Sequence, residues 1–294
     1  MSDNKKGRIL KGIGGFYYVD TGESLVTCRA RGKFRKTGET PRVGDIVEIS
    51  VQNDGSGYLL EIDERKNTLI RPPISNIDVI AIVASKAPPK TDTYFIDRIA
   101  AMAVHKNIEV CVVINKCDED IAEELYDIYK NTDVNIFRVS ALSGDGTEEL
   151  KKYLKGKFTA FTGNSGVGKS TLINSLLPSA NLETGEINDK IGRGRHTTRQ
   201  VEILKLDEDS WIADTPGFSA FDIVTKDGVT AESLQDLFPE FDEFKNDCRY
   251  IGCSHIKDSE CAIIEAVESG KIEKTRYESY VKMYEELESV PKYK

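Results

Sequence analysis

The sequence has no long apolar run and no secretion signal. Its longest apolar stretch, Val79 to Ala84, is far too short to cross a bilayer. The opening residues MSDNKKGRIL contain no apolar core of a signal peptide. Extremes of composition are also missing, because 39% hydrophobic residues, 30% charged residues and only three Met are typical of an ordinary globular protein. These absences argue against a membrane-spanning or secreted chain, and a cytoplasmic protein is expected.

The six cysteines are too few, in a chain without a secretion signal, to indicate a disulfide framework. Reduced thiols or metal ligands are expected instead. Four ligand-type residues fall within a short stretch with the spacing C-x₄-C-x-H-x₅-C: Cys248, Cys253, His255 and Cys261. Four such ligands complete a tetrahedral Zn²⁺ site and leave no open position, so one structural zinc ion is predicted. The alternative is a set of unliganded cysteines beside a chance histidine.

The net charge of −9 argues against a nucleic-acid partner for the chain as a whole, but one segment differs. Residues 29–42 carry six Lys or Arg against one Glu. Taken alone, such a run is more often a solvated loop than a binding site. Its position gives it more weight, because the first 66 residues consist of short β-branched and aromatic runs separated by glycines. About five strands in that length predict a small oligonucleotide-binding (OB-fold) barrel with basic loops.

From residue 78 the pattern changes to continuous apolar strands that alternate with amphipathic helices. This rhythm predicts a parallel sheet covered on both faces. The expected strands are 79–84, 109–115, 135–140, 157–163, 201–206 and 211–214. One expected helix, 94–106, has an apolar stripe of Phe95, Ile99, Met102 and Ala103. The preceding segment 67–76 contains Pro72 and Pro73 and is expected to be a linker.

A phosphate-binding loop comes after the fourth of these strands. The residues at 163–171, Gly-Asn-Ser-Gly-Val-Gly-Lys-Ser-Thr, match G-x-x-x-x-G-K-[ST] between a strand and a helix, which is the context the motif requires. The backbone N–H groups of Gly163, Asn164, Ser165, Gly166, Val167, Gly168 and Thr171 are expected around the phosphates. Lys169 adds positive charge there, and Ser170 is expected to ligate Mg²⁺.

Three further motifs complete a guanine-nucleotide site. Asp214 opens the sequence DTPG, where the carboxylate is expected to hold Mg²⁺ and the Gly217 N–H to sense the γ-phosphate. The sequence NKCD supplies Asn115, Lys116 and Asp118, and the last of these is expected to accept the N1 and N2 protons of guanine. Ser140 and Ala141 come after the next strand, where the Ala141 N–H is expected to reach guanine O6.

These motifs occur in an unusual order along the chain. The sequence resembles the translation-factor-related GTPases, in which the guanine-specificity motifs come after the phosphate loop instead of preceding it. Numbered by their motifs, the strands here run fourth, fifth, sixth, first, second, third, which gives the motif order G4-G5-G1-G2-G3. A circular permutation keeps every motif at the carboxyl edge of the sheet.

Together with the basic barrel and the Cys₃His spacing, the permuted order closely resembles the ribosome small subunit-dependent GTPase A family over essentially the whole chain. The resemblance implies a bacterial cytosolic GTPase that binds the 30S subunit late in assembly, contacts 16S rRNA and is stimulated by the subunit. It implies a multi-domain α/β protein with an OB-fold barrel (1–70), a circularly permuted GTPase domain (71–221) and an α-helical zinc-binding domain (222–294). A monomer without a membrane partner is expected.

The resemblance also implies a first switch at 193–202, with Thr198 as a Mg²⁺ ligand and His196 as the candidate catalytic residue. Phe218 stands where small GTPases carry a water-orienting glutamine, and an apolar ring cannot orient water, so another polar group is needed. The alternative is a histidine that contacts RNA or packs in the loop. Two other functions stay open: an ATP-using P-loop enzyme, and an RNA-binding scaffold that senses nucleotide with little hydrolysis.

Overall fold

The structure, a computed structural model of the chain, describes residues 3–32, 34, 38–180, 182, 201–214 and 228–289. The chain divides into two units, each discontinuous in sequence. The first unit comprises Met1–Ala81, Thr147–Thr162 and Lys169–Phe218, and the second comprises Ile82–Gly146, Gly163–Gly168 and Ser219–Lys294. The domain boundaries predicted at residues 70 and 221 stay predictions. Within the described ranges, no helix combines the length and the apolar character that a membrane span requires.

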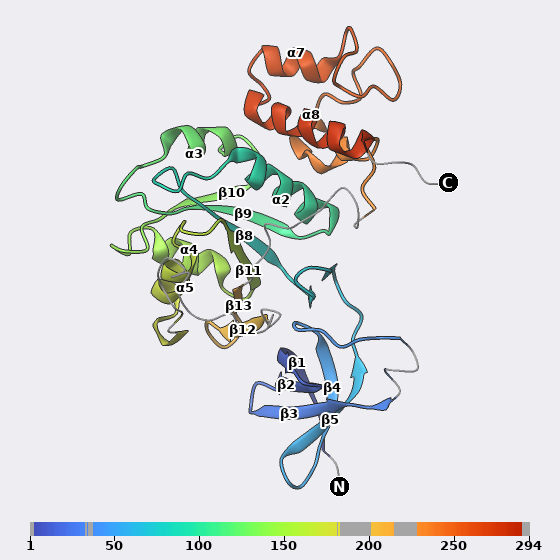
Figure 1. Cartoon of the computed structure of the whole chain (residues 1–294), viewed down its shortest axis with the longest axis vertical. Helices are drawn as coiled ribbons and strands as arrows, with labels where there is room; N and C mark the ends of the chain where they lie inside the picture. The colour runs from blue at the N-terminus through green and yellow to red at the C-terminus, as the bar shows by residue number, and fades with distance from the viewer. Residues whose placement is uncertain are drawn as a thin grey trace, which may run out of the picture. The chain divides into compact units, whose positions relative to one another are not determined.

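The N-terminal part forms the predicted five-stranded barrel (Figure 1). Its strands are β1 (Asp3–Ile13), β2 (Phe16–Asp20), β3 (Leu25–Ala30), β4 (Ile46–Val51) and β5 (Ser56–Ile62), closed in the order β1-β2-β3-β5-β4. The turn between β1 and β2 contains Gly14 and Gly15, whose φ angles of 58° and 84° are left-handed and suit glycine. This strand order and closure confirm the OB-type barrel.

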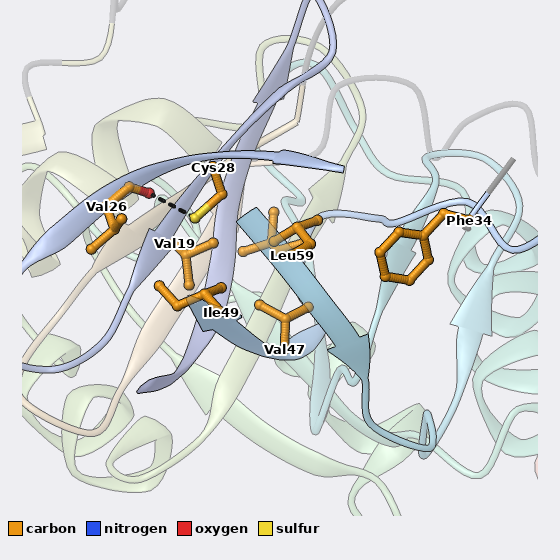
Figure 2. Packing of buried hydrophobic residues seen from close by; sticks show 8 residues of the cluster. Val19, Val26, Cys28, Phe34, Val47, Ile49 and Leu59 are labelled. Atoms are coloured by element: carbon orange, nitrogen blue, oxygen red, sulfur yellow. Dashed lines mark hydrogen bonds between the residues drawn. The ribbon is translucent and has the colours of Figure 1, made fainter. Parts of the chain in front are cut away.

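Alternate side chains of the barrel strands form its core (Figure 2). The strand residues are Ile9, Val19, Val26, Cys28, Val47, Ile49 and Leu59, and Phe34 joins them from the connection between β3 and β4. The Cys28 thiol donates to the Val26 carbonyl at 3.8 Å, and burial raises the pKa of this thiol to about 11. Cys28 is therefore an inert core residue, and the other face of β2, β3 and β5 is left for solvent or a ligand.

The central sheet has the strand order β10-β9-β8-β11-β13-β12. Its strands are β8 (Val79–Ala84), β9 (Glu109–Ile114), β10 (Asn135–Arg138), β11 (Phe158–Gly163), β12 (Glu202–Lys205) and β13 (Trp211–Asp214). Every residue of β8 is buried, as expected for a strand covered on both faces. The prediction of a wholly parallel sheet is wrong for β12, which pairs antiparallel with β13. The short turn between these strands permits only that direction.

Four helices accompany the sheet: α2 (Thr93–His105), α3 (Glu123–Tyr129), α4 (Thr147–Leu154) and α5 (Lys169–Leu176). In α2 the predicted stripe is buried at Ile99, Met102 and Ala103, whereas Phe95 is only half-buried. A short 3-10 helix, η1 (Pro178–Ala180), comes after α5.

The expected linker contains a small hairpin of β6 (Thr68–Leu69) and β7 (Ile74–Ser75). The fully buried Asp45 carboxylate holds it in place, because it accepts from Ser75 Oγ at 2.5 Å and from Arg65 Nε at 2.7 Å. Sequence periodicity gave no sign of this hairpin, since each strand is only two residues long.

The C-terminal part contains η3 (Leu234–Leu237), η4 (Pro239–Phe241), α7 (Ala262–Glu268) and α8 (Lys274–Glu288) (Figure 1). Within the second unit, α8 packs on α2. The buried Arg276 guanidinium donates to Asp97 Oδ1 on α2 and to Glu240 Oε1 on η4, both at 2.7 Å. Asp97 Oδ1 also accepts from the buried Tyr129 hydroxyl at 2.7 Å. The C-terminal helices are thus held to the GTPase part by buried charged groups.

A second charged contact joins the barrel to the sheet within the first unit. Arg8 of β1 lies between two rings, with its Cζ 5.0 Å from the centroid of Phe158 and 4.6 Å from that of Trp211. Burial lowers the pKa of the Arg8 guanidinium, and Asp78 opposes this effect. Phe158 and Trp211 are the first residues of β11 and β13. The barrel is therefore joined to the amino ends of these strands, away from the loops at their carboxyl ends.

Candidate nucleotide and metal sites

The segment predicted to bind phosphate connects a strand to a helix. Strand β11 ends at Gly163 and α5 begins at Lys169, so the intervening residues connect a strand end to a helix N-terminus. Gly166 and Gly168 adopt left-handed φ angles of 82° and 86°. A Cβ at Gly168 would collide with the Asn115 amide, and one at Gly166 would lie 3.0 Å from Pro89 Cγ. Both positions therefore require glycine.

Asn115 joins this loop to the two base-recognition motifs within the second unit. Its buried side chain donates from Nδ2 to the Val167 carbonyl at 2.9 Å and accepts from the Ala141 N–H at Oδ1 at 3.0 Å. Lys116, at a left-handed φ of 64°, donates from Nζ to the Pro88 carbonyl at 2.7 Å. The four loops that follow β8, β9, β10 and β11, at the carboxyl ends of neighbouring strands, are thereby fixed to one another.

The remaining base-recognition residues differ in exposure. Asp118 is exposed in the turn after β9, and Ser140 is buried. The Ser143 N–H donates to Ser140 Oγ at 3.1 Å, which shapes the turn around Ala141. The contact of the Ala141 N–H with guanine O6 stays a prediction, because in the structure this N–H donates to Asn115. Burial raises the pKa of the neighbouring Cys117 thiol.

The first unit contains the residue predicted to bind phosphate through its charge, Lys169, and the acidic residue predicted to bind Mg²⁺, Asp214. The Lys169 ammonium at the start of α5 forms an ion pair with the Asp214 carboxylate at the end of β13. Ser170 and Thr171 lie half-buried in the first turn of α5. In the second unit, Asn164 is half-buried and Ser165 is exposed. The predicted phosphate-binding cation and the predicted Mg²⁺-binding carboxylate thus lie in direct contact. His196, Thr198 and Gly217 lie outside the described residues, so their predicted roles stay predictions.

Cys248, Cys253, His255 and Cys261 converge on one point, as their spacing predicted, and their ligand atoms all lie within 4.8 Å of one another. Zn–S bonds of about 2.3 Å and Zn–N bonds of about 2.0 Å in a tetrahedron place sulfurs about 3.8 Å apart and sulfur and nitrogen about 3.5 Å apart. Cys248 Sγ lies 3.8 Å from Cys261 Sγ, and His255 Nδ1 lies 3.5 and 3.4 Å from the same two sulfurs. These three separations match a tetrahedral Zn²⁺ site, whereas the fourth ligand, Cys253, donates its thiol to Asp258 Oδ2 at 3.2 Å.

The surroundings of this cluster orient its histidine. His255 Nε2 lies 2.8 Å from Gln235 Oε1, so an Nε2–H donated to the amide oxygen leaves Nδ1 free to face the sulfurs. Burial lowers the pKa of His255 and so favours the neutral ring that binds metal. Tyr277 and Tyr280 donate from their hydroxyls to the carbonyls of His255 and Ser254 at 2.8 and 2.9 Å. Sequence reasoning missed Gln235, because it lies 20 residues from its partner and has no motif.

Comparison with known proteins agrees with this geometry. The model of the RsgA GTPase family matches residues 62–224, and the model of the RsgA N-terminal domain matches residues 6–59. The chain belongs to the RsgA GTPase family. The predicted family and enzyme class are therefore confirmed, and the sheet order agrees with the circular permutation.

Curated relatives and solved structures match along almost the whole chain. The small ribosomal subunit biogenesis GTPase RsgA of Caldanaerobacter subterraneus subsp. tengcongensis is 44% identical, covering 98% of this chain and 97% of the relative. Its namesake in Alkaliphilus metalliredigens is 40% identical, covering 98% and 99%. The crystal structure of YjeQ from Thermotoga maritima matches with a TM-score of 0.86 at 35% identity, covering 98% of this chain and 100% of that one. The structure of YloQ, described as a circularly permuted GTPase, gives 0.81 at 34%, covering 99% and 98%.

Proposed function

We propose that this chain hydrolyses GTP to GDP and phosphate while bound to the small ribosomal subunit, and that it assists the late maturation of that subunit in the bacterial cytoplasm. The observation that carries the proposal is the Asn115 side chain, which hydrogen-bonds both the phosphate loop and the Ala141 turn. A base-recognition motif tied in this way to a phosphate loop favours a guanine nucleotide over ATP. The names of the curated relatives support the ribosomal role.

In the proposed nucleotide complex, each charged group has a separate task. The loop from Gly163 to Gly168 and the N-terminus of α5 bind the phosphates, and Lys169 exchanges its contact with Asp214 for the β- and γ-phosphates. Asp214, Ser170 and Thr198 would hold Mg²⁺, which neutralises phosphate charge when bound. Asp118 selects guanine.

His196 is proposed as the residue that orients or activates the attacking water, since Phe218 cannot. His196→Ala should lower turnover roughly 10²-fold, a usual size for one general acid–base contact, while leaving nucleotide affinity nearly unchanged. Phosphate release by the full-length variant, with and without 30S subunits, measures this effect. A variant that turns over normally on 30S would transfer the role to rRNA or to another switch residue.

One structural zinc ion at the Cys₃His cluster is proposed to stabilise the C-terminal part, and the barrel is proposed to contact 16S rRNA. The protein is proposed to act as a monomer. The ligand-atom distances support the zinc site, and the five-stranded barrel supports the RNA contact.

Sedimentation with purified 30S and 50S subunits, in GDP or a non-hydrolysable GTP analogue, tests the proposal, with phosphate release measured in parallel. We expect association with 30S and not 50S, tighter association with the analogue, and hydrolysis that rises on adding 30S. Lys169→Ala is the control, because no other cation in the loop replaces it, and it should abolish hydrolysis. Association without stimulated hydrolysis would favour the nucleotide-sensing scaffold. Hydrolysis of GTP suppressed equally by ATP would favour the ATP-using enzyme.

A further inference from the structure

Three neighbouring strands of the barrel carry a row of large side chains across its outer face. Phe16 of β2 is the register partner of Arg29 of β3, and Arg29 is the partner of Tyr58 of β5. Partners directly opposite each other point to the same face of a sheet. The burial pattern of β3 alternates, with Arg29 exposed and Cys28 buried, so this face is the outer one. We call Phe16, Arg29 and Tyr58 the aromatic row.

The row is exposed although two of its members are large rings. Phe16 is 36% and Tyr58 41% exposed. The Arg29 Cζ lies 4.6 Å from the Phe16 ring centroid, and Arg31 Cζ lies 6.0 Å from that of Tyr58. Planar guanidinium groups therefore lie beside planar rings at the surface, an arrangement that presents flat faces and positive charge together.

The charge around the row contrasts with that of the chain. The chain carries 49 Asp and Glu against 40 Lys and Arg. On one side of the row, the adjacent outward positions of β1, β2, β3 and β5 are Lys11, Tyr18, Thr27 and Ser56, none of them acidic, and Asp54 accepts from Ser56 Oγ at the edge of this patch. A basic, aromatic face on an acidic protein complements a polyanion that also has flat apolar groups. RNA has both features, whereas an acidic peptide supplies only the charge.

The exposed rings indicate whether the RNA that binds this face is paired or unpaired. In an A-form duplex each base is stacked between its neighbours, so protein rings reach only backbone and groove edges. An unpaired base has a free face and stacks on an aromatic side chain of any kind. We infer that the aromatic row is a stacking platform for unpaired RNA bases, with Arg29 and Arg31 contacting the flanking phosphates. The inference rests on the proposed function, and it adds the residues and the class of RNA that they bind.

The test uses the full-length protein and an unpaired RNA of about eight nucleotides, a length within the range that one OB barrel covers, containing one 2-aminopurine. The same strand annealed to its complement serves as the duplex probe. Phe16→Leu and Tyr58→Leu keep apolar bulk but remove the ring, and Arg29→Lys keeps charge but removes the plane. Leu25→Ala is the matched control, because Leu25 is 60% exposed on β3 outside the row. Intrinsic GTP hydrolysis checks that each variant folds.

We expect each ring variant to weaken binding of the unpaired RNA by roughly 5- to 100-fold, the size of one stacked base, and to lose the 2-aminopurine quenching that stacking causes. Arg29→Lys should weaken it less, Leu25→Ala should bind normally, and the duplex should bind weakly to every protein. Normal affinity and quenching in the ring variants would overturn the inference. Binding of the duplex as tight as that of the single strand would overturn it too.

Sedimentation with 30S subunits separates this inference from the proposed function. If the wild-type chain does not associate with 30S subunits, the proposed function fails. The inference about the aromatic row is tested separately, by binding of the unpaired oligonucleotide. If ring variants lose 30S association but bind and quench the oligonucleotide normally, the row contacts a protein surface and the inference is wrong. Parallel loss of oligonucleotide and 30S binding in the ring variants, with Leu25→Ala unaffected, supports it.

Discussion

At the scale of single residues, the Asn115 amide has both a donor and an acceptor in use. Its Nδ2 holds the phosphate loop through Val167, and its Oδ1 holds the Ala141 turn. Because the side chain is buried, losing either hydrogen bond leaves a polar atom without water, at a cost of about 1–3 kcal/mol. The loops predicted to read the base and the loop predicted to bind phosphate are therefore held together by this one side chain. Asp118, in contrast, is exposed and available to a base.

Asp118→Asn should weaken GTP binding by roughly 10- to 100-fold, because a charged acceptor that pairs with two guanine protons is replaced by a group that also donates. Xanthosine triphosphate, which offers an acceptor at that position, should gain affinity. Calorimetric titration with both nucleotides measures the change, and Glu119→Gln, an exposed neighbour in the same turn, is the control. Unchanged preference for GTP in Asp118→Asn would remove the guanine-site assignment.

At the scale of secondary-structure elements, α8 is attached to α2 by the buried ion pair of Arg276 with Asp97 and by contacts of Tyr94 and Arg98 with Glu286. Arg276→Met should lower the free energy of unfolding by about 3–5 kcal/mol, because Asp97 and Glu240 would lose the cation that compensates their buried negative charge. Urea unfolding followed by far-UV circular dichroism measures this loss. Lys274→Met on the same helix removes an exposed ion pair with Glu278 and should change stability by less than about 0.5 kcal/mol. Equal effects of the two substitutions would contradict the assigned role of Arg276.

The metal cluster supports a different part of the same module. Cys253→Ser, or chelation of the wild type, should release one zinc ion and disorder the segment 248–261, because binding and folding are coupled in so small a loop. Helix α8 should keep much of its helicity through Arg276, so the circular dichroism signal should fall only in part. Zinc assay by mass spectrometry and spectral recovery on adding Zn²⁺ to chelated wild type complete the test. An unchanged spectrum and full proteolytic resistance without metal would show that the cluster does not stabilise the fold.

The sequence predicted elements whose causes are local and missed those whose causes lie far along the chain. The phosphate loop, the central strands and the Cys₃His cluster are determined by spacing within a few residues. The antiparallel direction of β12 depends on its partner β13, and the β6–β7 hairpin depends on Asp45 from the barrel. Gln235 and the Arg276–Asp97 pair join residues far apart in sequence, and no periodicity within one element reveals such partners.

At the scale of the whole molecule, the permutation changes the connection made by the segment after the DTPG motif. In the unpermuted order this segment returns to the sheet, whereas here it leads into the C-terminal module. The barrel, by contrast, contacts the amino ends of β11 and β13 through Arg8, a strand length of about 20 Å for β11 and about 13 Å for β13 from the loops at their carboxyl ends. Among the described residues, Arg8 thus contacts the ends of these strands that lie opposite the predicted nucleotide loops.

A flexible Gly/Ser spacer after Phe221, a position outside the described residues, should leave intrinsic GTP hydrolysis unchanged. It should shrink the difference in 30S affinity between the GTP-analogue and GDP states, because a conformational change of the segment after the DTPG motif would no longer be transmitted to the C-terminal module. Coupling between two sites commonly changes affinity by about 5- to 150-fold. The same spacer after Glu208, in the exposed turn between β12 and β13, is the control. A spacer variant that keeps the full difference would assign the coupling to another route, such as the α2–α8 contact through Arg276.

Trp211 is the only tryptophan in the chain, and it lies against Arg8 where the barrel meets the sheet. The intrinsic indole emission of this protein is therefore a signal from one place. The Arg8 guanidinium imposes a local electric field on the indole ring, and this field is lost when the barrel separates from the sheet. Opening of this junction, by heat, by pressure or by a ribosome, would thus shift the wavelength of the intrinsic Trp211 fluorescence, with no added label. Events confined to the C-terminal helices would leave this fluorescence unchanged.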